Sequence, residues 1–177
     1  MGDITWWNDS AIIATNPSVV MPKLPITVVV TTGEVSLVQI FTQAFAKFHP
    51  NFTQVIQVSQ SPTWPINKYQ KHISAAGLTG VGSAVIANDG TIGMAVQSVA
   101  MKLQVNTASL INKAGKVVRA SSDSVTFAAV ELGTALTLDS TNAADLTDCS
   151  ASSGWPIATF TYILIDLINS RGTCHGQ

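Results

Sequence analysis

The sequence has few charged residues. Asp, Glu, Lys and Arg make up 11% of its 177 residues, whereas globular proteins carry roughly 25%. The formal net charge is −1, and no cluster of Lys and Arg marks a surface for nucleic acid or an anionic membrane. We therefore expect no nucleic-acid partner. The polar surface must come from Ser, Thr, Asn and Gln, a composition more familiar in extracellular domains than in cytosolic enzymes.

The sequence also lacks a long apolar run. The longest candidate, residues 160–168, is interrupted by Asp166 and is shorter than the roughly 18 residues of a membrane helix. Residues 1–7 have neither the basic nor the apolar segment of a secretory signal. We expect an extracellular or periplasmic domain cut from a longer parent protein, and a membrane anchor elsewhere in that parent is one alternative.

Cysteine is nearly absent. The two cysteines, Cys149 and Cys174, lie in polar, turn-like stretches, and in a secreted setting such a pair favours a disulfide. We predict a Cys149–Cys174 bridge, with two free thiols as the alternative. Two sequons for N-glycosylation, at Asn8 and Asn51, agree with an extracellular setting but carry little weight in a chain rich in Ser and Thr.

No catalytic signature is present. The sequence contains no Gly-x-Ser-x-Gly, no His-Glu-x-x-His and no phosphate-cradling Gly-rich motif with Lys. The three histidines, His49, His72 and His175, lack the spacing of metal ligands. We therefore expect neither an enzyme, nor a metal site, nor a cofactor.

What the sequence does contain is a change of period between Pro25 and Phe48. A β-branched run at 26–30 is followed by small residues and then by apolar residues at helical spacing, which predicts a strand, a loop and a helix. In open α/β sheets, ligands bind beyond the carboxyl ends of strands, at helix N-termini. The alternative is a solvated connection whose residues only cap the helix. The candidate ligand-binding residues are Thr31, Thr32, Gly33, Glu34 and Ser36.

The remaining sequence predicts shorter elements. We expect a helix between an N-cap at Asn8 or Asp9 and a stop at Asn16-Pro17. Further along we expect a strand at 55–58, a loop at 69–80, a helix at 81–87, a strand at 91–95, a helix at 97–103, a hairpin at 108–119, a helix at 121–131 and a strand at 161–165. This order predicts an α/β domain with a mixed central sheet of about five strands flanked by helices. The expected core includes Val28, Val29, Phe41, Phe45, Val85, Ile92, Val125 and Ile163.

Several stretches match one family pattern in order along the chain. They are Gly-Asp-Ile-Thr-Trp-Trp-Asn-Asp (2–9), Pro-Ile-Thr-Val-Val (25–29), Trp-Pro (64–65), Gly-Thr-Ile-Gly (90–93), Asn-Lys-Ala-Gly-Lys (112–116) and Trp-Pro-Ile-Ala-Thr-Phe-Thr-Tyr (155–162). The chain thereby resembles the second lobe of the periplasmic phosphate-binding proteins of phosphate ABC transporters. The resemblance implies a type II periplasmic-binding-protein-like lobe over residues 1–166 and a missing first lobe of the same protein as partner. Residues 167–177 are polar and glycine-containing, and we expect them to form a tail that is unanchored unless the Cys149–Cys174 bridge ties it to the lobe.

The ligand loop departs from that family. Its members carry His-Arg-Ser-Asp-x-Ser-Gly-Thr-Thr after the strand, where this chain has Val-Thr-Thr-Gly-Glu-Val-Ser-Leu-Val (30–38). Thr31 stands at the position of the phosphate-binding Arg and Gly33 at that of its Asp partner. Phosphate would lose charge-assisted contacts of roughly 1.5–3 kcal/mol each and would meet Glu34. We expect a ligand-binding or sensory lobe with altered or lost phosphate binding; the alternative is a structural or protein-interaction domain of a membrane receptor.

Overall fold

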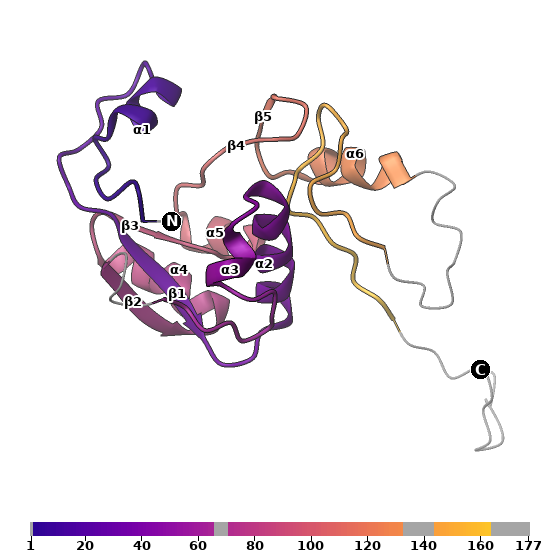
Figure 1. Cartoon of the computed structure of the whole chain (residues 1–177), viewed down its shortest axis with the longest axis horizontal. Coiled ribbons are helices and arrows are strands. Elements are labelled where there is room, and N and C mark those ends of the chain that lie inside the picture. The colour runs from indigo at the N-terminus through magenta and orange to yellow at the C-terminus, as the bar shows by residue number, and fades with distance from the viewer. Residues whose placement is uncertain (1, 66–70, 133–143, 164–177) are drawn as a thin grey trace.

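The computed structural model describes residues 2–65, 71–132 and 144–163, and Figure 1 shows their arrangement. In chain order the elements are α1 (Ser10–Thr15), β1 (Thr27–Thr32), α2 (Ser36–Phe48), α3 (Phe52–Val55), β2 (Lys71–Ala76), α4 (Gly77–Ala87), β3 (Thr91–Gly93), α5 (Gln97–Leu103), β4 (Leu110–Ile111), β5 (Val117–Val118) and α6 (Ser122–Leu132). None of the helices in these ranges has both the length and the apolar character needed to cross a membrane.

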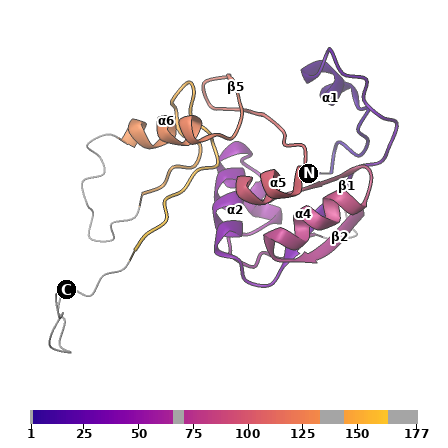
Figure 2. The same cartoon turned by 180° about the vertical axis from the view of Figure 1, so that it is seen from behind.

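The first unit is built on a parallel sheet with the strand order β2-β1-β3. β1 pairs with β2 over six residues, from Thr27 with Lys71 to Thr32 with Ala76, and with β3 over three. α2 connects β1 to β2 on one side of it, and α4 connects β2 back across β1 to β3 on the other side. Because parallel crossovers are right-handed, α2 and α4 belong to opposite faces. Figures 1 and 2 show α4 lying across the strands and α2 standing at one side of them.

β1 is the central strand because its residues are apolar on both faces. Val29 and Val30 point to opposite faces, and they are 1% and 4% exposed. Gly93 of β3 lies beside Val29, and a Cβ built on Gly93 would come within 2.5 Å of Val81 in α4 and 3.2 Å of Val29. Val29 therefore faces α4, and the missing side chain at Gly93 lets this helix approach the sheet closely.

The second unit combines the hairpin, α6 and residues 144–163. β4 and β5 pair in antiparallel fashion, and Gly115 in their turn takes the left-handed conformation, with φ +72°, that glycine tolerates best. The buried centre consists of Ala128, Leu146 and Ala158, with Val125 and Trp155 among the side chains packed against it. α6 thus stabilises the unit by burying one apolar face against the returning chain.

Asn112 joins the hairpin to the returning chain and is only 5% exposed. Its Nδ2 donates hydrogen bonds of 3.0–3.2 Å to the backbone carbonyls of Ala151, Ser152 and Gly154. Its Oδ1 accepts from the backbone N–H groups of Ala114 and Lys116 at 3.1 and 3.0 Å. Both ends of the buried amide are therefore satisfied, so its burial carries little desolvation penalty and orients both loops.

Two side chains of α2 connect the units through Asp145. Lys47 Nζ lies 2.7 Å from Asp145 Oδ2 and 2.9 Å from the carbonyl oxygen of Thr147, and Gln43 Nε2 donates to the same Oδ2 at 2.8 Å. Burial raises the pKa of Asp145, but the hydrogen bonds from Lys47, Thr147 and Gln43 outweigh it and bring this pKa from 3.8 to about 2. The ionised carboxylate is thus the form that holds the units together.

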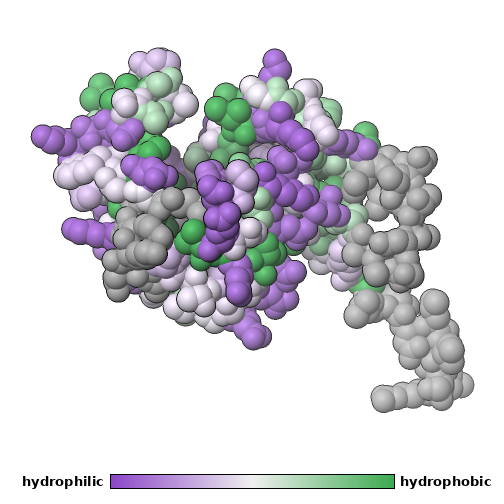
Figure 3. Space-filling model, in the orientation of Figure 1, coloured by the Kyte–Doolittle hydropathy of each residue, from purple (hydrophilic) through white to green (hydrophobic). Residues whose placement is uncertain are grey.

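Residues 2–26 form an arm ahead of the sheet. Asp9 is the N-cap of α1, and its carboxylate accepts the N–H of Ala11 at 2.9 Å. Trp7 Nε1 donates to the carbonyl oxygen of Gly90 at 2.9 Å and so ties the arm to the loop before β3. Ile13 and Val20 are 45% and 97% exposed, and Figure 3 shows hydrophobic side chains exposed over α1 at the upper left. The arm therefore presents apolar surface that no described residue covers.

Elements with strong local signals were predicted correctly. The helices expected after an N-cap at Asn8 or Asp9, at 97–103 and at 121–131 correspond to α1, α5 and α6, and the structure shows that Asp9 is the cap of α1. The strand at 91–95 corresponds to β3, although it ends at Gly93, and the hairpin corresponds to β4 and β5. The helix after the first strand also ends as expected, with His49 as its C-cap ahead of Pro50.

Two elements between α2 and α4 were predicted wrongly. Residues 55–58 are not a strand, because Phe52 opens the short helix α3 and packs edge-on against Phe45, with ring centroids 5.7 Å apart. The apolar residues Phe52 and Ile56 therefore follow a helical spacing of four. The loop expected at 69–80 contains β2 from Lys71 onward. α4 also begins at Gly77, four residues earlier than predicted.

The mixed five-stranded sheet is also wrong for the described residues, where the sheet has three parallel strands and the hairpin is separate from it. Residues 161–163 are not a strand, and 164–165 lie outside the described residues. Two expected core residues are exposed, Ile92 at 43% and Ile163 at 85%. Ile92 alternates with Gly93 on an edge strand, so it points away from α4.

Candidate ligand-binding loop

The candidate site is the connection from β1 to α2, at the carboxyl end of the central strand. The strand ends at Thr32, and Gly33 follows with φ +83°. This left-handed conformation favours glycine, and a Cβ at Gly33 would have no heavy atom within 4 Å. Val35 then anchors the loop through its N–H, which donates to the carbonyl oxygen of Gln60 at 3.1 Å. The sharp turn lifts the intervening residue, Glu34, into solvent.

α2 begins without a cap from any described side chain. Its N-cap residue is Val35, which has no hydrogen-bonding side chain, and its first turn contains no acidic residue. The orphan N–H groups of a helix start carry partial positive charge. Ser36, the first residue of α2, is exposed. The helix start therefore offers donors to solvent or to a ligand at the edge of the sheet.

Thr31 and Thr32 point to opposite faces of the sheet. Thr31 lies two residues from Val29 and so shares the face toward α4. Its partner Ala75 agrees with this, because the Ala75 Cβ lies 3.6 Å from a Cβ built on Gly80 of α4. Thr31 is 6% exposed, and its Oγ1 has no hydrogen-bond partner. Thr32 is exposed, and its hydroxyl donates to the carbonyl oxygen of Ala75 at 3.3 Å.

The structure thus places four of the five candidates together. Thr32, Gly33, Glu34 and Ser36 form an exposed edge of hydroxyls, backbone donors and one carboxylate. Thr31 lies beneath this edge rather than on it. No Lys or Arg occurs between Thr31 and Ser36. Such a set suits hydroxyl or ammonium groups better than a dianion.

A second helix start, at Gly77, adjoins this edge. Thr32 pairs with Ala76, so the carboxyl ends of β1 and β2 are neighbours. α4 starts directly after Ala76, again without a side-chain cap, and Gly77 has φ +62° with open space around its Cβ position. Two glycine turns leading into uncapped helices therefore lie side by side. The sequence predicts a loop through Gly80, and this prediction is wrong because α4 already begins at Gly77.

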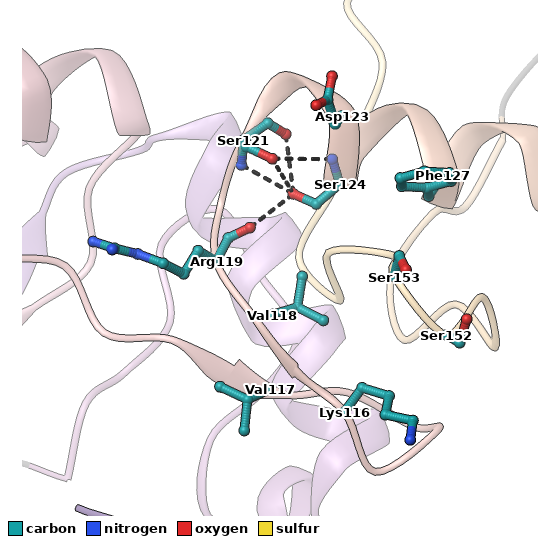
Figure 4. Close-up of a pocket in the computed structure, with 10 residues that line it drawn as sticks. All are labelled: Lys116, Val117, Val118, Arg119, Ser121, Asp123, Ser124, Phe127, Ser152 and Ser153. Atoms are coloured by element: carbon teal, nitrogen blue, oxygen red, sulfur yellow. Dashed lines mark hydrogen bonds between the residues drawn. The ribbon is translucent and has the colours of Figure 1, made fainter. Parts of the chain in front are cut away.

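A separate groove of about 470 Å³ lies between β5, the start of α6 and residues 152–153 (Figure 4). Ser121 and Ser124 cap the start of α6 reciprocally. The Ser124 N–H donates to Ser121 Oγ at 3.1 Å, and the Ser121 N–H donates to Ser124 Oγ at 2.9 Å. Figure 4 shows Phe127 beside the groove and the Arg119 side chain extending away from it. The sequence analysis gave no indication of this groove.

Cys149 is half-buried and free among the described residues. Its predicted partner, Cys174, lies outside them, so the bridge stays a prediction. Burial first, and then the charge of Glu131, raise the pKa of the Cys149 thiol, which lowers its thiolate fraction at neutral pH. No group of three His, Cys, Asp or Glu suited to a metal ion occurs in the described ranges.

No protein-family model matches the chain. The chain is similar to curated proteins named phosphate-binding protein PstS. The relative from Xylella fastidiosa strain 9a5c is 29% identical over 169 residues, which cover 93% of this chain and 43% of that protein. The relative from Methanocaldococcus jannaschii is 24% identical over 172 residues, covering 93% of this chain and 44% of that protein. The chain spans less than half the length of these relatives, and together with the α/β architecture the similarity supports a lobe like that of phosphate-binding proteins.

Proposed function

We propose that this chain is the ligand-binding or sensory lobe of an extracellular or periplasmic solute-binding protein of the type II class. The observation that carries the proposal is the similarity to PstS proteins over 93% of the chain. The position of Thr32, Gly33, Glu34 and Ser36 beyond the carboxyl end of the central strand supports it, because open α/β sheets bind ligands there. Thr31 supports this edge from beneath.

A partner lobe of the same protein completes the proposed site. The relatives are more than twice as long as the matched region, since the match covers only 43% of the first of them. A ligand held between two lobes contacts this loop from one side and the partner lobe from the other. Binding by the 177 residues alone is therefore expected to be weaker than binding by the longest natural form.

We propose further that phosphate binding is altered or lost. The Arg contact that Thr31 lacks is worth about 1.5–3 kcal/mol, or roughly 10- to 150-fold in affinity. Glu34 adds a like charge beside any phosphate dianion. A ligand with hydroxyl or ammonium groups would instead pair with the Glu34 carboxylate and with the hydroxyls of Thr32 and Ser36.

Calorimetric titration of inorganic phosphate into the longest natural form of the protein tests this proposal. Millimolar phosphate is expected to give no specific heat of binding. Micromolar affinity that is lost in Ser36→Ala and kept in Ser122→Ala would show that the loop still binds anions. Ser122 is a matched control because it is also an exposed serine at the first position of a helix, α6, in the other unit.

The nature of the ligand can be tested by thermal shift with a panel of sugars, amino acids and polyamines. A true ligand of this loop is expected to raise the Tm of the wild type and of Asp123→Asn but not that of Glu34→Gln. Asp123 is the matched control, because it is an exposed carboxylate in the first turn of α6. Equal shifts in both variants would contradict a role for Glu34.

The second candidate function is a structural or protein-interaction domain of a membrane receptor. The observation that favours it is exposed apolar surface in this unit: Val117 and Phe127 line the groove and are 72% and 51% exposed, and Val130, further along α6, is 68% exposed. Exposed apolar patches mark protein interaction sites when they are large and contiguous. The natural flanking sequence discriminates the two functions: a first lobe with an intact ligand loop favours solute binding, whereas a transmembrane segment followed by a signalling domain favours the receptor.

A further inference from the structure

The two N-glycosylation sequons differ in how exposed their asparagine side chains are in the fold. One comprises Asn8, Asp9 and Ser10, and the other comprises Asn51, Phe52 and Thr53. Asn51 and Thr53 are exposed, whereas Asn8 is half-buried. Because a bulky glycan needs an acceptor asparagine on the surface, this difference in exposure makes the two sequons unequal.

Asn51 occupies a turn that presents its amide to solvent. It lies between the end of α2 and the start of α3, with φ −90° and ψ 0°. It is the N-cap residue of α3, yet its side chain makes no capping hydrogen bond. The middle residue of the sequon, Phe52, is 5% exposed and packs against Phe45. The buried Phe52 fixes the turn, while the two residues that the modifying enzyme must reach, Asn51 and Thr53, stay on the surface.

Asn8 is half-buried and lies between two residues that are held by hydrogen bonds. The preceding Trp7 is tied to Gly90 through its indole N–H, and the following Asp9 caps α1 with its carboxylate. The backbone N–H of Asp9 also donates to the carbonyl oxygen of Trp6 at 3.2 Å. A large glycan on the half-buried Asn8 would crowd these hydrogen-bonded neighbours, which join the arm to the loop before β3.

We propose that Asn51 is an N-glycosylation site and that Asn8 is not. The donor is an oligosaccharide linked to a polyprenyl pyrophosphate. Asn51 Nδ2 forms a bond to the anomeric carbon, the bond from that carbon to the pyrophosphate oxygen breaks, the polyprenyl pyrophosphate leaves, and one amide proton passes to the enzyme's base. This inference is independent of the proposed ligand site, since Asn51 follows the opposite end of α2 from Ser36.

Two consequences follow for the surface. Phe48, at the end of α2, is 40% exposed close to Asn51 in sequence, and a glycan supplies hydration there to a chain with only 11% charged residues. A glycan at Asn51 also keeps the end of α2 in solvent. A partner lobe or partner protein must then contact the molecule elsewhere.

Secretion of the 177-residue chain from a eukaryotic host tests the proposal, with enzymatic removal of N-glycans read by gel shift and mass. The wild type, Asn8→Gln and Thr53→Ser are expected to carry one glycan, because Thr53→Ser preserves the sequon. Asn51→Gln and Thr53→Ala are expected to carry none. Circular dichroism of each secreted variant checks that it is folded.

An unmodified wild type would overturn the assignment. A glycan that persists in Asn51→Gln, or two glycans on the wild type, would overturn the distinction between the sequons. Neither result bears on phosphate or ligand binding, so the two proposals fail separately.

Discussion

Replacing Thr31 by valine should stabilise this protein, although the substitution removes a polar group from the central strand. Thr31 is 6% exposed and its Oγ1 lacks a hydrogen-bond partner. A buried hydroxyl without a partner costs about 1–3 kcal/mol relative to water. Valine has nearly the same shape and favours strands, so Thr31→Val removes that cost without opening a cavity. We expect the free energy of unfolding to rise by about 1 kcal/mol, near the lower end of that range.

Thr42 provides the matched control. It is 0% exposed, but its Oγ1 donates to the carbonyl oxygens of Val38 and Gln39 at 3.1 and 3.0 Å and accepts the N–H of Ser59 at 3.2 Å. Thr42→Val leaves that N–H without its acceptor, so stability should fall by about 1–3 kcal/mol. The same substitution should therefore raise the free energy of unfolding at Thr31 and lower it at Thr42.

Urea unfolding followed by the fluorescence of the four tryptophans measures both changes. In thermal unfolding as a second measurement, 1 kcal/mol corresponds at this chain length to about 2–4 °C in Tm, which is resolved easily. A loss of stability in Thr31→Val similar to that in Thr42→Val would refute the reasoning, because it would mean that the Thr31 hydroxyl has a partner. If that hydroxyl is reserved for a ligand, Thr31→Val should gain stability and lose ligand affinity together.

Three further predictions concern packing, pH and the cysteines. Gly93→Ala should cost about 1–3 kcal/mol by overpacking, because its Cβ would come within 2.5 Å of Val81; an unchanged urea midpoint would contradict the close approach of α4. The pKa of Asp145 is lowered from 3.8 to about 2, so its ion pair with Lys47 should stabilise the fold above pH 3.8 and lose this effect as the pH falls toward 2. For an exposed pair, the contribution to the free energy of unfolding should be no more than about 1 kcal/mol. Asp145→Asn should remove this pH dependence of stability. Alkylation and mass measurement of the oxidised protein should show no free thiol at Cys149 or Cys174, and the bridge should contribute roughly 3 kcal/mol; two alkylated thiols would contradict it.

Sequence and structure differ most in the strands beside β1. Nothing in Lys-His-Ile-Ser-Ala-Ala predicts a strand by period or propensity, and residues 71–76 become β2 because β1 supplies hydrogen-bond partners about 44 positions earlier in the chain. The opposite error occurred at 55–58, where a short alternation predicted a strand but contact between Phe52 and Phe45 favours a helix. Both errors have one cause: the residues that determine the local structure, in β1 and at Phe45, belong to another element of the chain.

For the candidate loop too, local signals in the sequence predicted part of the structure, and pairing with a distant strand decided the rest. Its place after the first strand was predicted from the change of period, because a strand, a glycine turn and a helix start each have local signals. Only the register with β2 shows that Thr31 is buried toward α4 while Thr32 is exposed at the edge. Likewise, only the pairing of β2 beside β1 places Gly77 next to this loop.

The sequence by itself determined the elements whose causes lie within a few residues. Examples are the start of α1 after a cap at Asn8 or Asp9, the end of α2 at His49 ahead of Pro50, and the glycine turn of the hairpin. Caps, proline and turns act through local backbone geometry. Tertiary structure alone decided which strands pair, which side of each strand is buried, and which of the two sequons is exposed. These depend on packing between segments far apart in the chain, where side-chain burial outweighs local propensity.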